Sequence, residues 1–389
     1  MMRSRHMQTC KLLLCAVCQR CWQFWPRLWV ATVCLLTGGL VQAQSVVFIN
    51  PGMSDEIFWI SATDAMRKAA DSLGMRLSVV TVERDRLKPM ELAQALAQLP
   101  AQERPDYLLF SNEYSVAPSV LKALEGSGIK AFMAFSGIHE DLRPQVGLPR
   151  ARFPFWLGSL ESNAEDAGYR TAKTLIAEAQ KHPEWRDEQG QWQMLAIAGD
   201  RSTPVSITRN QGLLKAVSEA GGAVKLMQLV YGEWRQDKAQ QQAAGLFRRY
   251  PQARMVWSGN DVMALGAMQA WEEQGGVPGT DAVFSGINTS AQALEKLRKG
   301  QLTAMAGGHF LAGAWSMVML FDYHHGVDFA DEGLEQKRPM FMLFDVSNSK
   351  RFEQRLGAGS MVSLDFRQFS KYLNPHLKRY DFDIHRLLH

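Results

Sequence analysis

The sequence predicts an α/β protein with two lobes, each formed around a doubly wound parallel sheet. From Ser45 onward, short apolar runs of strand length alternate with stretches in which apolar residues recur at helical spacing. This alternation starts again near Trp156, after a first complete run of strands and helices. No linker rich in Pro, Gly or Ser separates the two runs. The length of 389 residues is enough for two such lobes, each with its own core.

The first run contains four apolar segments of strand length with three helical segments between them. The segment 46–49 is continuously apolar, and the helix that follows it stops at Gly74, a residue type common just past helix ends. Strands alternating with helices of this length indicate βαβ units around a parallel sheet. We expect strands at residues 46–49, 76–82, 106–110 and 129–135, and helices at residues 59–73, 90–99 and 116–124.

The second run has the same organisation and ends in an apolar segment at residues 302–306. The polar, Trp-containing stretch 182–191 interrupts it, and we interpret this stretch as a surface insertion. We expect strands at residues 156–159, 193–198, 224–230, 255–257 and 282–284, and helices at residues 164–179, 208–220, 239–250, 262–271 and 294–299.

The first 43 residues have the composition of a targeting segment. They carry five basic residues and no acidic one, and the apolar run 28–40 precedes the small-residue pattern Val41-Gln42-Ala43. This order is typical of a signal peptide, and the apolar run is too short to span a bilayer comfortably. We therefore expect export, removal of residues 1–43 and a mature chain that starts at Gln44.

All five cysteines lie in this leader, three of them with the spacing C-x2-C-x2-C. A removed leader cannot hold a structural metal, so we expect no metal site, and the mature chain has no cysteine for disulfide or thiol chemistry. Without the leader the chain has 38 basic and 39 acidic residues. A near-neutral body argues against nucleic-acid binding as the main function.

The stretch 255–271 gives the clearest local signal for a site. A short apolar run at residues 255–257 is followed by Asn260-Asp261 and then by apolar residues at helical spacing. We expect Asp261 to cap the helix and Asn260 to project beyond the carboxyl end of the strand, where open parallel sheets bind ligands. An amide side chain carries both a donor and an acceptor, which suits a polyhydroxylated ligand. The alternative is that both residues only cap the helix.

Other polar and aromatic residues also follow expected strands. Each of them has a structural alternative as a turn, a cap or a packed aromatic. Together they would supply aromatic faces, amides and one guanidinium group, which suit a small polar ligand held between two lobes by stacking and forked hydrogen bonds. The candidate ligand-binding residues are Ser54, Phe58, Trp59, Asn112, Arg209, Trp234, Asn260, Asn288 and His309.

The motifs of common enzyme classes do not occur. There is no G-x-S-x-G, no G-x-x-x-x-G-K and no H-E-x-x-H. Ser136 and Ser285 lack the preceding glycine that a nucleophile elbow needs, and the adjacent His324 and His325 would point in different directions on a helix. We therefore expect a binding protein with no catalytic residue and no cofactor.

The residues Asn260-Asp261-Val262-Met263-Ala264-Leu265-Gly266-Ala267 are similar to the N-D-x-M-A-L-G-A motif of the sugar-binding class of type I periplasmic binding proteins. The resemblance extends over about residues 46–346. Phe58-Trp59 stands where that family has paired aromatic residues, and Arg209, Trp234 and Asn260 fall on its ligand-binding arginine, stacking aromatic and asparagine.

The sequence also departs from the ribose-binding members of that family. Asn288 replaces a ligand-binding aspartate, Phe135-Ser136 replaces an Asp-Arg pair, and Gly308 replaces a glutamine, with His309 next to it. These changes remove charged groups that hold hydroxyls, so they argue against ribose itself. The loop 51–55 and Trp59 resemble instead the autoinducer-2 receptor of the same fold, whose role is signalling.

The resemblance implies two lobes joined by three crossover segments, the first formed by residues 44–158 plus 309–338 and the second by residues 159–308 plus 339–389. The tail 347–389 is longer than the family needs, and it either packs on a lobe or contacts a partner. The implied function is capture of a small, sugar-like ligand in the periplasm by lobe closure and delivery to an ABC importer. The alternative is a receptor that signals through a membrane sensor kinase or cyclase.

Overall fold

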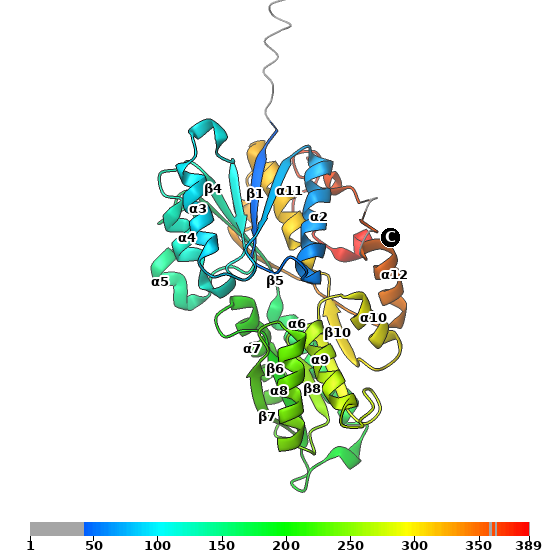
Figure 1. Ribbon diagram of the computed structural model, residues 1–389. Coiled ribbons are helices and arrows are strands. Elements are labelled where there is room, and N and C mark those ends of the chain that lie inside the picture. Colours follow the sequence, from blue (N-terminus) through cyan, green and yellow to red (C-terminus); the bar gives the residue numbers. More distant parts are fainter. Residues whose placement is uncertain (1–42, 358–359, 362–363, 389) are drawn as a thin grey trace, which may run out of the picture. The chain divides into compact units, whose positions relative to one another are not determined.

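The computed structural model describes residues 43–357, 360–361 and 364–388. The expected signal peptide, apart from Ala43, lies outside these residues. Gln44–His389 forms one compact unit, and Figure 1 shows within it the two sheets with their flanking helices. No helix in the described part of the chain is long and apolar enough to cross a membrane.

The first lobe contains a six-stranded sheet in which every pairing is parallel, in the order β11-β5-β4-β3-β1-β2. Its inner strands are almost completely buried because helices cover both faces. The strands are β1 (Ser45–Asn50), β2 (Arg76–Thr81), β3 (Tyr107–Phe110), β4 (Lys130–Phe135), β5 (Trp156–Ser162) and β11 (Glu335–Arg338). The helices are α2 (Ile57–Leu73), α3 (Lys88–Gln98), α4 (Ala117–Ala123), α5 (Arg143–Val146) and α11 (Ala312–His324).

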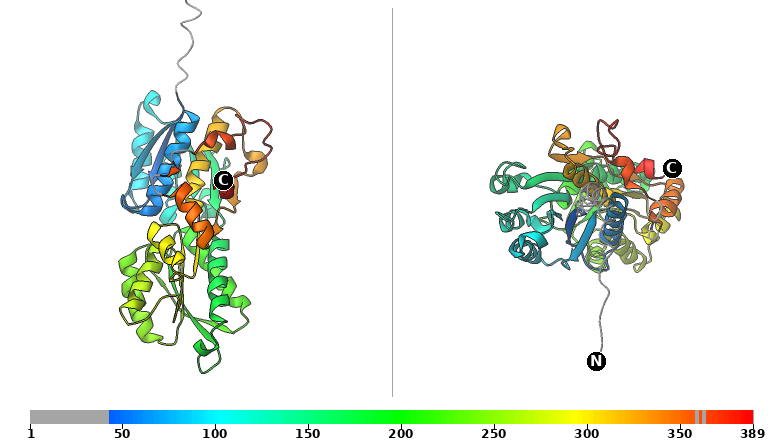
Figure 2. Two further views of the ribbon diagram at one scale, coloured as in Figure 1. Left: turned by 90° about the vertical axis from the view of Figure 1, so that its right-hand side faces the viewer. Right: turned by 90° about the horizontal axis from the view of Figure 1, so that it is seen from above.

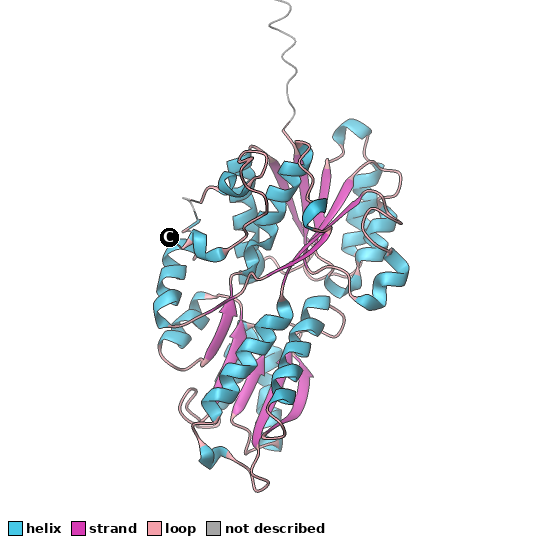
Figure 3. Cartoon of the chain, turned by 180° about the vertical axis from the view of Figure 1, so that it is seen from behind, coloured by secondary structure: helices cyan, strands magenta, loops and turns pink. Residues whose placement is uncertain are grey.

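The second lobe repeats this plan with the order β12-β10-β9-β8-β6-β7, in which only the edge strand β12 is antiparallel. Helices lie on both sides of this sheet (Figure 3). The strands are β6 (Trp192–Ala198), β7 (Val224–Tyr231), β8 (Met255–Ser258), β9 (Val283–Ile287), β10 (Ala304–Gly307) and β12 (Met342–Leu343). The helices are α6 (Ala164–Ala179), α7 (Pro204–Glu219), α8 (Gln236–Arg249), α9 (Asp261–Glu272), α10 (Ala291–Arg298) and α12 (Val346–Leu356).

The chain crosses between the two sheets after β5, after β10 and between β11 and β12. This confirms the expected fold class of two doubly wound lobes. The expected boundary after Gly158 differs from the structure, because β5 continues to Ser162 and pairs with both β4 and β11 in the first sheet. The apolar run that predicted this strand ends early, since Glu161 is polar although it belongs to the strand.

The tail also differs from the expected division, which placed residues 339–389 in the second lobe. Residues 364–388 lie instead against α2 and α11 of the first lobe, where their aromatic rings join the core that contains Trp315. Figure 2 shows the red C-terminal segment beside the orange-yellow α11. Burial of apolar rings against an apolar helix explains this placement. In α11 every residue from Ala312 to Asp322 is buried.

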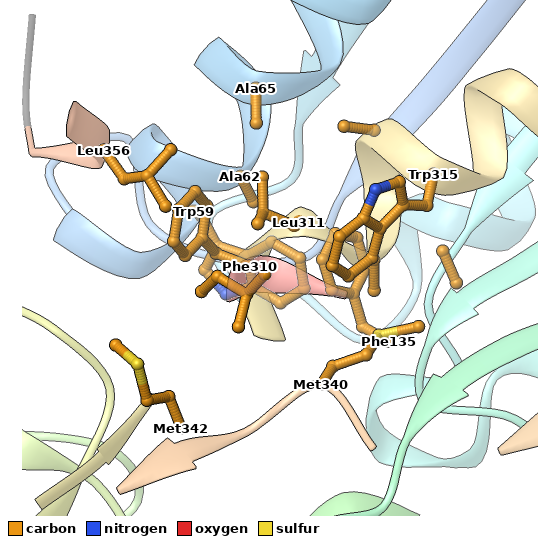
Figure 4. Packing of buried hydrophobic residues seen from close by; sticks show 14 of the residues in the cluster. Trp59, Ala62, Ala65, Phe135, Phe310, Leu311, Trp315, Met340, Met342 and Leu356 are labelled. Carbon is orange, nitrogen blue, oxygen red and sulfur yellow. The ribbon is translucent and has the colours of Figure 1, made fainter. Parts of the chain in front are cut away.

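One hydrophobic cluster connects the first lobe with the crossovers. It joins Trp59 of α2, the segment 310–315 that follows the second crossover, and Met340 in the third crossover. Figure 4 shows these side chains around Phe135 and Phe310. The same cluster also contains Ile197 of β6 and Trp234 of the second lobe.

Candidate functional site

A pocket lies between the loops at the carboxyl ends of strands in the two lobes, and its empty space of about 430 Å³ includes space that is open to solvent. The first lobe and the second both contribute to the lining. The lining residues are Glu56, Phe58, Trp59, Arg84, Glu113, Phe135, Val205, Arg209, Trp234, Asn260, Asn288 and His309.

An aromatic wall forms the first-lobe side of the pocket. The ring of Trp59 meets Phe58 edge-on at 5.0 Å and Phe135 edge-on at 5.1 Å between ring centroids. A Cβ at residue 52 would lie 1.9 Å from Cδ1 of Trp59, so this ring rests directly on the glycine backbone. The loop that follows β1 therefore needs Gly52 for the indole to occupy this place.

Trp234 provides the facing aromatic group from the second lobe. Its Nε1 donates a hydrogen bond of 2.9 Å to Oδ2 of Asp200, and its ring covers Gly199 so closely that an added Cβ there would lie 2.2 Å from the ring. The backbone of Trp234 has a φ of 63°, in the left-handed region that side chains rarely adopt. These constraints hold the indole in one orientation at the pocket edge.

Arg209 and His309 form a buried pair at the bottom of the pocket. Arg209 donates 2.7 Å to the carbonyl of Gly259 and 2.9 Å to Nε2 of His309. Burial lowers the pKa of Arg209 to about 10, so the guanidinium is still charged at neutral pH. Its Nε has no hydrogen-bond partner among the described residues.

The imidazole of His309 is neutral. Burial, followed by the charge of Arg209, holds its pKa well below the usual value. Because Nε2 accepts from Arg209, Nδ1 carries the proton, and within the described structure this N–H has no partner. The ring lies between Phe58 at 4.8 Å and Phe341 at 4.4 Å. Each of the two side chains thus keeps one buried N–H group without an acceptor among the described residues.

The sequence predicted that Asp261 caps α9 and that Asn260 projects beyond the strand, and the structure differs on the first point. Asn260 is the residue that caps α9, since its Oδ1 accepts from the backbone N–H of Met263 at 2.9 Å. Asp261 instead accepts from the backbone N–H of Ser290 at 2.8 Å and from Nδ2 of Asn288 at 3.2 Å. A buried carboxylate is better satisfied by several donors than by one cap position. Both asparagines still line the pocket.

Three charged residues from the first lobe also line the pocket, namely Glu56, Arg84 and Glu113. None of them was among the candidates predicted from the sequence. Arg84 donates through Nε and Nη2 to the two carboxylate oxygens of Glu56 and through Nη1 to the hydroxyl of Tyr114. Burial alone would lower the pKa of Arg84, but the charges of Glu56 and Glu113 raise it above the usual value. Burial raises the pKa of Glu113 to about 7, against the opposing effect of Arg84.

Glu113 and its neighbours contact the second lobe directly. Oγ1 of Thr203 donates 3.3 Å to Oε2 of Glu113 and accepts 3.2 Å from the backbone N–H of Tyr114. The hydroxyl of Ser115 donates 3.0 Å to the carbonyl of Ser202. These bonds join the short 3-10 helix Glu113–Ser115 to the loop before α7 across the mouth of the pocket.

The structure brings together seven of the nine candidate residues. Ser54 is exposed, and its backbone N–H donates to Glu83. Asn112 is buried behind the pocket, where its side chain accepts from the N–H of Ala117 and donates to the carbonyl of Gly137. The candidates that line the pocket are Phe58, Trp59, Arg209, Trp234, Asn260, Asn288 and His309.

Strained backbone conformations concentrate around the pocket. Four of its lining residues, Arg84, Phe135, Trp234 and Asn288, have positive φ without being glycine. Such conformations cost free energy and are common at ligand sites, where the surrounding structure fixes a side chain in place. The described residues contain no group of three or more potential metal ligands.

Comparison with known proteins agrees with this geometry. The sequence profile of the periplasmic binding protein domain matches residues 46–326. The structure of a periplasmic sugar-binding protein from Pseudomonas fluorescens has 38% sequence identity and a TM-score of 0.79, and the match covers 89% of this chain and 100% of that one.

Two further relatives are more distant. The D-apiose import binding protein of Actinobacillus succinogenes is 23% identical over 314 residues, which are 79% of this chain and 90% of that protein. The myo-inositol binding protein of Caulobacter, bound to myo-inositol, is 15% identical with a TM-score of 0.65, over 80% of this chain and 97% of that one. At this identity the second likeness shows the fold alone.

Proposed function

Because this chain belongs to the periplasmic binding protein family, we propose that it captures a small neutral polyol or sugar in the periplasm and presents it to an ABC importer. Lobe closure would enclose the ligand without making or breaking a covalent bond. Relatives described as a periplasmic sugar-binding protein and a D-apiose import binding protein support this ligand class.

The observation that carries this proposal is the composition of the pocket. Trp59 and Trp234 offer aromatic faces from opposite lobes, on which the C–H faces of a sugar ring can stack. Arg209, Asn260 and Asn288 supply the forked donors and acceptors that hydroxyl groups need. A ligand that contacts both lobes favours the closed form by its differential affinity for that form.

A thermal-shift screen tests the ligand class. D-apiose, D-allose, L-arabinose and myo-inositol form the panel, with glycine betaine and L-leucine as non-sugar controls. We expect at least one polyol or sugar to raise the melting temperature in a concentration-dependent way, with isothermal calorimetry giving its Kd. Stabilisation by a control compound alone would contradict the proposed class.

Signalling is a second candidate for the output of ligand binding. It is favoured by the loop 51–55, in which Gly52 lies against Trp59 at the pocket, because this loop and tryptophan resemble a receptor of the same fold. A pull-down from solubilised inner membranes, with and without the bound sugar, separates the two candidates. Recovery of a permease supports transport, whereas recovery of a sensor kinase or cyclase supports signalling.

A further inference from the structure

The pocket contains two carboxylates in very different situations. Both oxygens of Glu56 accept from Arg84, so this side chain is fully engaged in an ion pair. Glu113 is only 3.9 Å from Arg84 at its nearest, and the bond that the structure describes at its carboxylate, from Thr203, uses Oε2. Of the four oxygens of these two carboxylates, Oε1 of Glu113 is therefore the one that accepts no hydrogen bond from the described residues.

Other side chains that line the pocket carry N–H donors, among them those of Arg209, Asn288 and His309. Nε of Arg209 and Nδ1 of His309 have no partner among the described residues. The side-chain oxygen of Asn260 is occupied by the N–H of Met263. A polyol bound here must donate some of its hydroxyl protons, and a carboxylate is a stronger acceptor for them than an amide.

We propose that Glu113 binds a hydroxyl group of the ligand and couples this contact to lobe closure through Thr203. The inference rests on the proposed function and deepens it, because it makes a hydroxyl donor on the side facing the first lobe a requirement for recognition. One carboxylate would then receive a bond from the ligand and a bond from the opposite lobe. A sugar lacking that hydroxyl would lose the first of these bonds.

The variant Glu113→Gln tests this role because it keeps the shape of the side chain and removes the charge. Calorimetry uses the tightest-binding sugar of the panel and its monodeoxy analogues. We expect Glu113→Gln to weaken binding of the parent sugar by about ten- to a hundredfold. For one deoxy analogue, the unaltered protein should bind the parent sugar much more tightly than the analogue. In Glu113→Gln this difference in affinity between the two sugars should be much smaller.

Thr203→Val is the matched variant, since it removes the two bonds that Oγ1 of Thr203 makes to the first lobe and leaves the carboxylate in place. Thr203→Val should weaken binding of the parent sugar and of all its analogues by about the same factor. The ratio of affinities between the parent sugar and each analogue should therefore stay as in the unaltered protein. If Glu113→Gln binds the sugar within twofold and discriminates the analogues as before, the inference is wrong while the proposed function stands. If the unaltered protein binds no sugar of the panel, the proposed function fails and this inference falls with it.

A second inference concerns the C-terminal tail. Helix α12 belongs to the second lobe, where Glu353 pairs with Arg298 at 3.0 Å. The chain then returns to the first lobe, and residues 364–388 pack there. It therefore makes a fourth passage between the lobes, in addition to the three crossovers.

The tail is firmly attached to α11. The buried carboxylate of Asp322 accepts from the backbone N–H of Lys371 at 2.7 Å, from the hydroxyl of Tyr380 at 3.0 Å and from the hydroxyl of Ser370. The ring of Phe382 stacks on Trp315 at 5.3 Å with 15° between the ring planes. Several charge-assisted bonds to one buried acid form a strong attachment.

Beyond this attachment the tail reaches the hinge. A Cβ added to Gly308, in the second crossover, would lie 2.4 Å from Cδ1 of Ile384 and 3.1 Å from the carbonyl oxygen of Met340, in the third crossover. Gly308 has a φ of 108°, a conformation that glycine tolerates. The side chain of Ile384 thus lies against the segment whose dihedral angles must change when the lobes open.

We infer that the tail limits lobe opening, with Ile384 as the contact that acts on the hinge. The test uses single-molecule energy transfer between dyes on cysteines introduced at the exposed Lys122 of α4 and Lys215 of α7. The sequence has no other cysteine after Cys34, so labelling is specific. Ile384→Ala should widen the distribution of interlobe distances measured without sugar.

Leu387→Ala is the matched control because it removes a buried side chain of equal size from the same 3-10 helix, Ile384–Leu387. It should lower the melting temperature without widening the distribution. A distance distribution that is unchanged in Ile384→Ala would overturn the inference.

Discussion

Arg209 donates a hydrogen bond of 2.9 Å to Nε2 of His309, which joins α7 of the second lobe to the crossover after β10. The bond requires a neutral imidazole, since a protonated ring has no acceptor. Burial and the charge of Arg209 both lower the pKa of His309. The Arg209 guanidinium and a protonated His309 would repel each other. The two side chains can stay in contact because the imidazole is uncharged.

This relationship predicts an acid sensitivity of folding. An unfolded histidine takes up a proton below about pH 6.5, whereas the buried His309 does not, so its contribution to stability is present above that pH and is lost as pH falls. Replacement by Gln keeps an acceptor for Arg209 and removes the titration. Between pH 8 and pH 5, the melting temperature of His309→Gln should fall less than that of the unaltered protein. Parallel curves would show that His309 titrates normally.

Glu113 should produce a pH dependence of opposite sign. Its pKa rises from 4.5 to about 7 on folding because burial disfavours the charge. The folded state is therefore penalised as pH rises from about 4.5 to about 7, by an amount on the order of 3 kcal/mol when complete. Glu113→Gln should gain melting temperature relative to the unaltered protein over this interval. A constant difference between the two at pH 5 and pH 8 would refute the assignment.

Arg209 should be the strongest single determinant of sugar affinity in the second lobe. Loss of a hydrogen bond from a charged donor costs roughly 1.5–3 kcal/mol, so Arg209→Ala should weaken sugar binding by about ten- to a hundredfold. The control is Arg201→Ala in the same lobe, because the guanidinium of Arg201 lies over the ring of Tyr231, away from the pocket. In calorimetry, the Kd of Arg201→Ala for the sugar should lie within twofold of that of the unaltered protein. An equal loss of affinity in both variants would show that the sugar does not bind at Arg209.

Substitution of Gly199 should move the indole ring of Trp234 while leaving the tryptophan itself in place. A Cβ at Gly199 would lie 2.2 Å from the indole ring, so Gly199→Ala must displace the ring or the backbone at a cost of about 1–3 kcal/mol. Gly245→Ala, in the middle of α8 with no atom near the added Cβ, should instead be neutral or stabilise by about 0.5–1 kcal/mol. Sugar affinity should fall only in Gly199→Ala. Equal affinity in both variants would argue that Trp234 only packs.

The sequence predicted the two-lobed fold well because its signals are local. Apolar runs such as 46–49 and helix stops such as Gly74 depend on neighbouring residues, and both appear in the structure at the expected places. The boundary near Gly158 was missed because β5 continues through Glu161, whose polarity hides the strand. The tail was undetermined because its attachment depends on Asp322, which is distant in sequence.

The pocket was predictable where a side chain lies within two residues of the end of a strand. Asn260, Asn288 and His309 have this position, and all three line the pocket. Glu113 lies in a 3-10 helix and Arg84 in a turn with positive φ, so neither position carries a periodic pattern. A charged residue in a loop is expected to be exposed to solvent when only the sequence is known. The burial of Glu113 and Arg84 depends on contacts between the lobes, which the sequence does not show.

Export has a direct test. If residues 1–43 are a signal peptide, the intact mass of the periplasmic protein should correspond to a chain that starts at Gln44 and contains no cysteine. A mature protein that retains Cys10 to Cys34 would contradict removal of the leader.

Small-angle X-ray scattering measures whether a sugar is captured by closure of the two lobes. With the tightest-binding sugar of the panel at saturation, the scattering profile should match that calculated from the described structure, in which Glu113 and Thr203 are in contact. Without sugar, the radius of gyration should be larger because the lobes separate about the hinge at Gly308. An identical profile with and without the saturating sugar would contradict capture by closure.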